Sequence, residues 1–278
     1  MRRFAQVDVF TSRPGYGNPV AVVVDGEGLS DEQMARLARW TNLSETTFLL
    51  PATQPGADYR VRIFTPGGEL PFAGHPTLGS CHAWLASGPA PRSPGRVVQE
   101  CGVGLVELVA VEGGYAFAAP PLERSELSDE QLQTVVDALR IERDEVLRSA
   151  MLVNGPDWAT IQLRTAAQVL ALEPDLPRLG QLKLGVLGCY PSPGPGEPLL
   201  EVRAFVPGIG VPEDPVTGSL NAALAQWLIA EGVLPASYLA SQGTVLGRSG
   251  RVQVRRDDAG RVWVGGACVT VVDGTVTI

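Results

Sequence analysis

The sequence predicts an α+β protein made of two pseudo-repeated halves, each a mainly antiparallel sheet wrapped around one central helix. Three observations lead to this prediction. Segments 61–85 and 202–228 resemble one another, strand-like segments outnumber helical ones and are joined by short turns, and the helix in each copy is apolar on all sides. At 278 residues the chain is long enough for two domains.

The repeat rests on identities at a fixed spacing. Five residues recur 141 positions later, which is close to half of the 278-residue chain: Arg62, Phe64, Pro66, Gly67 and Pro71 return as Arg203, Phe205, Pro207, Gly208 and Pro212. Each copy then passes through a turn into an apolar helical segment. A strand–turn–helix motif that is used twice without duplication is the alternative. We expect domains at 1–120 and 121–278, and the last strand can return to the first domain.

The first half begins with strands. Segments 4–10 and 19–25 alternate or run apolar with β-branched residues, as strands do. Segment 29–43 is a predicted helix, because Ser30 and Gln33 have the spacing of a capping box. Segment 96–120 then predicts strands with tight turns.

The second half opens with a predicted helix at 127–141, where Ser128 and Gln131 repeat the capping box. This helix begins the second half, whereas the one at 29–43 follows the first strands of the first half. The Pro-rich segment 191–198 predicts a loop, and segment 251–278 predicts a closing hairpin.

The composition argues against several classes of function. The net charge is −8 and there is no basic run, so we expect no nucleic-acid partner. No apolar stretch approaches a membrane span, and the start lacks the apolar core of a signal peptide, so we expect no membrane association and a cytoplasmic location. The four cysteines are widely spaced, which favours reduced thiols and predicts no metal site. Lys183 is the only lysine, which argues against a pyridoxal cofactor.

Two loop–helix junctions carry the residues that could do chemistry. Small polar groups gather at the start of each apolar helix: Gly74, His75, Pro76 and Thr77 in the first copy, and Thr217, Gly218 and Ser219 in the second. A helix N-terminus has unpaired N–H groups and a partial positive charge, so it attracts anions. Two such tips that face each other would line a cleft for a small anion.

His75 and Asp214 are the proton-carrying candidates at these junctions. Histidine is the usual proton carrier near neutral pH, and an aspartate in a partly dry groove can act as a base or orient a histidine. Taken singly, each has an ordinary structural explanation, since Asp214 precedes a proline and can form a turn, and His75 can be a capping residue.

Six motifs together resemble the phenazine-biosynthesis isomerase (PhzF-like) family, whose fold is shared with diaminopimelate epimerase. They span nearly the whole chain in order: GNPVAVV (17–23), NLSETTFLLP (42–51), RIFTP (62–66), AGHPTLG (73–79), EDPVTGS (213–219) and VWVGGACV (262–269). The resemblance implies two α+β domains with the active site between them. It also implies a proton-transfer isomerase that needs no cofactor, acting on a small carboxylate-bearing substrate, and a homodimer.

The resemblance also assigns catalytic roles. It implies that Glu45 is the acid/base, and that His75, Asp214 and Ser219 complete the site. We expect Gly74, Pro76, Thr77, Thr217 and Gly218 to bind the substrate. Composition alone would have left Glu45 as a solvated residue between a helix and a strand. A carboxyl in a closed groove loses hydration and can then give and take a proton near pH 7.

The chain departs from the epimerase relatives, which place a thiol at each junction. Here the matching positions fall on Ala73 and Asp214, so a two-thiol racemase is disfavoured. Leu220 stands where the family commonly has a small residue, which leaves the floor of the pocket undefined. An amino-acid epimerase of the same fold and a non-catalytic binder of small acids remain as alternatives.

Overall fold

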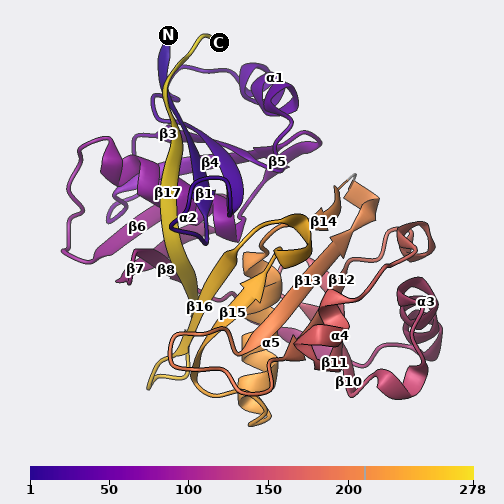
Figure 1. Ribbon diagram of the computed structural model, residues 1–278. Helices are drawn as coiled ribbons and strands as arrows, with labels where there is room; N and C mark the ends of the chain where they lie inside the picture. Colours follow the sequence, from indigo (N-terminus) through magenta and orange to yellow (C-terminus); the bar gives the residue numbers. More distant parts are fainter. Residues whose placement is uncertain (210) are drawn as a thin grey trace. The chain divides into compact units, whose positions relative to one another are not determined.

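The computed structural model describes residues 1–209 and 211–278. The chain divides into two compact units (Figure 1). The first unit comprises Met1–Ala118 and Gly265–Ile278, and the second comprises Ala119–Val264. The last strand, β17 (Val262–Val276), therefore begins in the second unit and continues in the first.

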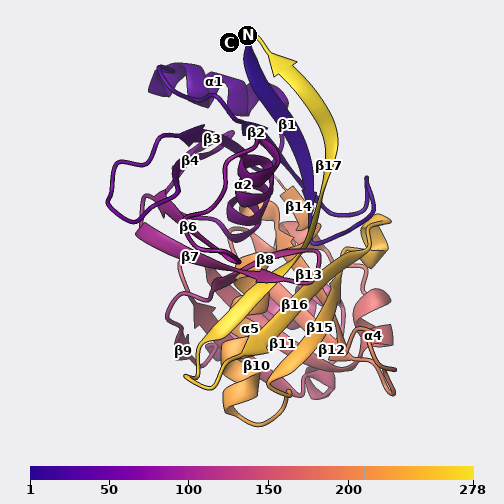
Figure 2. The ribbon, with the colours of Figure 1, turned by 90° about the vertical axis from the view of Figure 1, so that its left-hand side faces the viewer.

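The first unit is a sheet with two helices. Its strands are β1 (Arg2–Val9), β2 (Asn18–Val23), β3 (Thr46–Leu50), β4 (Tyr59–Thr65), β5 (Gly68–Leu70), β6 (Arg96–Cys101), β7 (Gly104–Val111), β8 (Gly114–Ala118) and the later part of β17, and its helices are α1 (Asp31–Thr41) and α2 (Gly74–Ala86). Antiparallel pairing of β1 with β17 brings Arg2 opposite Val276, so the two chain ends lie side by side (Figures 1 and 2).

The second unit contains the remaining elements. Its strands are β9 (Glu123–Ser125), β10 (Arg148–Val153), β11 (Asp157–Thr165), β12 (Leu184–Cys189), β13 (Leu200–Val206), β14 (Val211–Asp214), β15 (Ser237–Gln242) and β16 (Gly250–Arg256), and its helices are α3 (Asp129–Leu139), α4 (Ala166–Leu170) and α5 (Gly218–Ala230). Short 3₁₀ turns lie at Arg143–Glu145, Leu176–Leu179, Pro207–Ile209 and Thr244–Leu246.

The strand pairings of the two units match step by step. In the first unit β2–β3 and β4–β6 are parallel, while β3–β4, β4–β5 and β6–β7 are antiparallel. In the second, β11–β12 and β13–β15 are parallel, while β12–β13, β13–β14 and β15–β16 are antiparallel. The predicted pseudo-repeat is confirmed, and β13 follows β4 by 141 residues.

The two helices with similar capping sequences, α1 and α3, occupy different places in the repeat. The helix α3 precedes the first strands of its repeat, whereas α1 lies between β2 and β3. The position equivalent to α1 is therefore that of α4, between β11 and β12, which also begins with a capping box. The capping sequences of α1 and α3 are alike because a capping box marks the start of a helix and not its place in a fold.

A buried helix runs through each unit, as predicted. The helix α2 contacts β1, β2, β3, β4, β6 and β8, and Figure 2 shows it within these strands. The helix α5 contacts β10 and β16, and its residues from Leu220 to Ala225 are fully buried. Such helices bury every face, which explains their apolar sequences. Within the described part of the chain, no helix has the length and apolar character that a membrane span requires.

Candidate active site

Glu45 lies at the junction between α1 and β3, as the sequence predicts. Its side chain is 15% exposed, and its Oε2 lies 3.4 Å from Nε2 of His75. Its backbone carbonyl accepts a hydrogen bond from the Ala21 N–H, so the turn is fixed to β2. Glu45 is therefore held at a buried imidazole and is not a solvated surface residue.

His75 is the second residue of α2 and is 7% exposed. Burial lowers the pKa of His75 to about 3, and a hydrogen bond to the Pro19 backbone only partly opposes this shift. The imidazole is therefore neutral at pH 7. Its Nδ1 lies 3.5 Å from the side-chain amide nitrogen of Asn18, which is itself fully buried at the start of β2.

A neutral imidazole against a carboxyl group is suited to proton exchange. A neutral ring has one donor and one acceptor nitrogen, so it can accept a hydrogen bond from a protonated Glu45 or donate one to the Glu45 carboxylate. Asn18 and Pro19 hold the far side of the ring. Sequence reasoning missed this role of Asn18, although the GNPVAVV motif that contains it contributed to the family resemblance.

The other residues at the start of α2 differ in what they can offer a ligand. Among the described residues, no side chain caps this helix, whose N-cap is Ala73, so the N–H groups of its first turn are available. Gly74 and His75 provide such groups, whereas Pro76 has no N–H. Thr77 is fully buried and its hydroxyl accepts a hydrogen bond from Gln99, so this side chain is engaged in the core.

The start of α5 is organised by a polar network. Thr217, the N-cap, donates its hydroxyl hydrogen to Oδ2 of Asp214 at 2.6 Å, while its Oγ1 accepts from Nε2 of Gln242 at 2.9 Å. Oε1 of Gln242 accepts from the Thr217 N–H and from Asn221. The chain of donors therefore ends on the Asp214 carboxylate. Gln242 and Asn221 have no motif signal in the sequence.

Ser219 is held by two other side chains of the second unit. Trp158 donates its indole N–H to the Ser219 Oγ at 3.3 Å, and Asn154 donates its amide to the Ser219 carbonyl at 2.8 Å. The backbone at Gly218 and Ser219 forms the first turn of α5, which lacks a capping side chain among the described residues. Its N–H groups can therefore receive an anion.

The structure shows where the two helices begin and where Leu220 lies. The N-caps are Ala73 in α2 and Thr217 in α5. The helices are offset by 144 residues, since the second loop is longer than the first. Leu220 is fully buried and fills the space above Gly185 of β12, where a Cβ would lie 2.5 Å from a Leu220 methyl. Leu220 therefore packs in the core.

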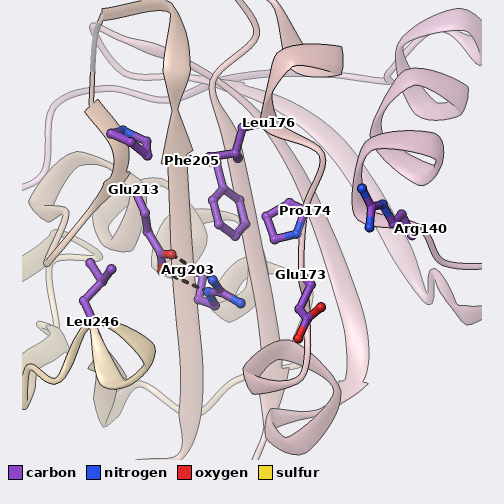
Figure 3. Close-up of a pocket in the computed structure, with 9 residues that line it drawn as sticks. Arg140, Glu173, Pro174, Leu176, Arg203, Phe205, Glu213 and Leu246 are labelled. Carbon is purple, nitrogen blue, oxygen red and sulfur yellow. Dashed lines mark hydrogen bonds and ion pairs between the residues drawn. The ribbon is translucent and has the colours of Figure 1, made fainter.

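Glu213, which precedes Asp214 in β14, lines a cavity of about 460 Å³ (Figure 3). Its lining residues, all in the second unit, are Arg140, Glu173, Pro174, Leu176, Arg203, Phe205, Pro212, Glu213 and Leu246. Glu213 accepts two hydrogen bonds from Arg203, at 2.9 and 2.8 Å. Because neighbouring strand residues point to opposite faces, this bidentate pair fixes β14 from the side opposite to Asp214.

Neither helix tip carries a thiol, since the N-caps are Ala73 and Thr217. Cys81 lies deeper in α2, where burial raises its pKa well above the usual range. Across residues 1–209 and 211–278, no cluster of three or more His, Cys, Asp or Glu side chains could hold a metal. The side chains at the two tips that can exchange protons are therefore carboxyl, imidazole and hydroxyl groups.

Comparison with known proteins places the chain in a family. The model of a family described as "Phenazine biosynthesis-like protein" (PhzC-PhzF) matches residues 7–274. "Antisense-enhancing sequence 1" of Schizosaccharomyces pombe is 38% identical over 98% of this chain and 97% of its own length. Trans-2,3-dihydro-3-hydroxyanthranilate isomerase of Pseudomonas aeruginosa is 34% identical over 94% of this chain and 92% of its own. A Bacillus anthracis PhzF-family crystal structure superposes with a TM-score of 0.85 at 21% identity, covering 100% and 99% of the two chains.

These matches define an enzyme of the isomerase class with the epimerase-like α+β fold. The chain belongs to the PhzC-PhzF family of phenazine biosynthesis-like proteins. The family and the fold class predicted from the sequence are both confirmed.

Proposed function

We propose that this isomerase shifts a proton on a small carboxylate-bearing substrate by acid/base catalysis, without a cofactor. Glu45 removes a proton from one carbon of the substrate and returns it to another, so the reaction is balanced without a redox partner. The observation that carries this proposal is the 3.4 Å contact between Glu45 and a buried, neutral His75. General acid/base catalysis of this kind contributes about 10²–10⁴-fold to a rate.

The start of α5 offers groups that could bind a negatively charged substrate. Its first-turn N–H groups attract a carboxylate, and the Ser219 hydroxyl can hydrogen-bond to an oxygen that becomes anionic during the reaction. Asp214, which receives the Thr217 hydrogen, would hold a donor group of the substrate. The shared cleft and the homodimer expected from the sequence stay predictions.

The substrate named for the Pseudomonas aeruginosa relative, trans-2,3-dihydro-3-hydroxyanthranilate, is the first compound to test. We expect Glu45→Gln to lower turnover at least about a hundredfold, because an amide cannot exchange a proton as a carboxyl does. Glu32→Gln, an exposed position in α1, is the matched control and should keep the wild-type rate. Near-normal turnover by Glu45→Gln, with circular dichroism showing an intact fold, would remove Glu45 from the mechanism.

A further inference from the structure

Ser219 is fixed by the β10–β11 hairpin of the second unit. Trp158, the second residue of β11, donates its indole N–H to the Ser219 hydroxyl oxygen at 3.3 Å. Asn154, in the turn between the two strands, holds the Ser219 carbonyl at 2.8 Å. Both side chains are buried, Trp158 at 3% and Asn154 at 6% exposure. The hairpin thus contacts Ser219 at its backbone and at its side chain.

The direction of the Trp158 bond determines what Ser219 can do. An indole N–H is a donor and never an acceptor, so the Ser219 oxygen must be the acceptor in this contact. The hydroxyl hydrogen of Ser219 then points away from Trp158 and is available to another acceptor. A hydroxyl without such a contact can rotate and offer either its lone pairs or its hydrogen.

We propose that Trp158 is a positioning residue that makes Ser219 a hydrogen-bond donor toward an anionic oxygen of the substrate. This inference rests on the proposed function, in which Ser219 contacts the substrate. A donor whose direction is fixed before the reaction stabilises developing negative charge without reorganising in the transition state. Trp158 therefore acts through Ser219, and the loss of its N–H should mainly lower kcat and leave KM within about twofold.

Trp158→Phe removes the N–H while keeping a buried ring. The chain offers a matched control in Trp263, which is also 3% exposed and whose indole N–H bonds to Asp257 at 2.9 Å. With trans-2,3-dihydro-3-hydroxyanthranilate as substrate, we expect Trp158→Phe to lower kcat about tenfold. Trp263→Phe should stay within twofold of wild type. Equal kcat values for these two variants would overturn the inference.

A double-mutant cycle separates positioning from packing. If Trp158 acts through the Ser219 hydroxyl, Trp158→Phe combined with Ser219→Ala should be no slower than Ser219→Ala alone. If the double variant loses kcat by the product of the two single-variant factors, Trp158 acts independently of Ser219. That result would refute the proposal. The Glu45→Gln result is separate, because it tests the proposed function and leaves this coupling unaffected.

NMR can test the Trp158–Ser219 hydrogen bond without measuring turnover and without substituting Trp158. In ¹⁵N-tryptophan-labelled protein, Ser219→Ala should shift the indole N–H resonance of Trp158 and speed its exchange with solvent at least about tenfold. The Trp263 resonance should not move. An unchanged Trp158 resonance would show that the bond does not exist in solution. If no turnover is found, the resonance and the solvent exchange of the Trp158 indole N–H remain the test, with Trp263 as the control.

Discussion

The two repeats build the same architecture and place different chemistry on it. At the start of α2, a histidine and a glutamate are kept in contact by burial, and the N-cap is an alanine. At the start of α5, the N-cap is a threonine that links Gln242 to Asp214 through hydrogen bonds. One tip carries groups that can exchange protons, and the other carries hydrogen-bond donors whose directions are fixed. The two repeats therefore share strand order and helix position, while the residues at their helix tips differ.

The ion pairs on the strands before the two buried helices also differ between the units. Arg62 binds Glu69 in the first unit, and Arg203 binds Glu213 in the second. The first pair is partly exposed, at 17% and 42%, and Arg62 also contacts Asp31. The second pair is buried, at 4% and 8%. We therefore expect the loss of a partner to cost more stability in the second pair than in the first.

Substitutions that break these two ion pairs should give the largest difference in the free energy of unfolding between the units. We expect Glu213→Gln to lower the free energy of unfolding by about 3–5 kcal/mol, because Arg203 would be left buried without its partner charge. Glu69→Gln should cost no more than about 1 kcal/mol, since its pair is exposed to solvent and Arg62 keeps Asp31. Urea unfolding of the two variants measures the difference. Equal losses would contradict the assigned burial of the second pair.

The neutral His75 predicts that the stability of the protein depends on pH. Its pKa is lowered to about 3 in the folded state, so between pH 6.5 and pH 3 the unfolded chain binds a proton that the folded chain does not. Stability due to His75 is therefore lost as the pH falls through this window. We expect His75→Asn to remove about 2 kcal/mol of the loss between pH 6.5 and pH 5.

Urea midpoints of wild type and His75→Asn at these two pH values test this expectation. His82 is the other histidine, and burial lowers its pKa as well, so the difference between variants, not the wild-type slope, is the informative quantity. If the two proteins lose stability in parallel on acidification, His75 is not held neutral.

The smallest expected effect compares two threonines that each accept a hydrogen bond from a glutamine. Thr217 also donates to Asp214, whereas Thr77 is enclosed in the core of the first unit. Thr217→Val should lower turnover about tenfold, the effect of losing one hydrogen bond to a charged group. Thr77→Val should lower the melting temperature and leave turnover within twofold. Equal rates for the two variants would show that the Thr217–Asp214 bond has no catalytic role.

Sequence reasoning reached the fold because its signals are long-range and redundant. The 141-residue spacing links β4 to β13, and the apolar character of two whole helices marks them as buried. The two capping boxes located the starts of α1 and α3 correctly. The small polar residues also located the start of α5 at Thr217, although the spacing of the strands does not report the longer loop before that helix.

The candidate site was only partly accessible from sequence. Glu45 came from the family resemblance, since nothing in the local pattern shows that its side chain meets His75. Asn18, Gln242 and Trp158 could not be found, because each acts through a contact with a residue at least 25 positions away in the sequence. Such contacts depend on strand pairing and helix packing, which a single sequence does not encode locally.

The most direct test of the central claim follows the transferred proton itself. During prolonged incubation of trans-2,3-dihydro-3-hydroxyanthranilate in D₂O, a carboxyl group that exchanges with water between transfers should place deuterium at the reacting carbon. Proton NMR should show this exchange with wild type and show it at least about a hundredfold more slowly with Glu45→Gln. Deuterium that enters at the wild-type rate in the variant would contradict the assignment of Glu45 as the proton carrier.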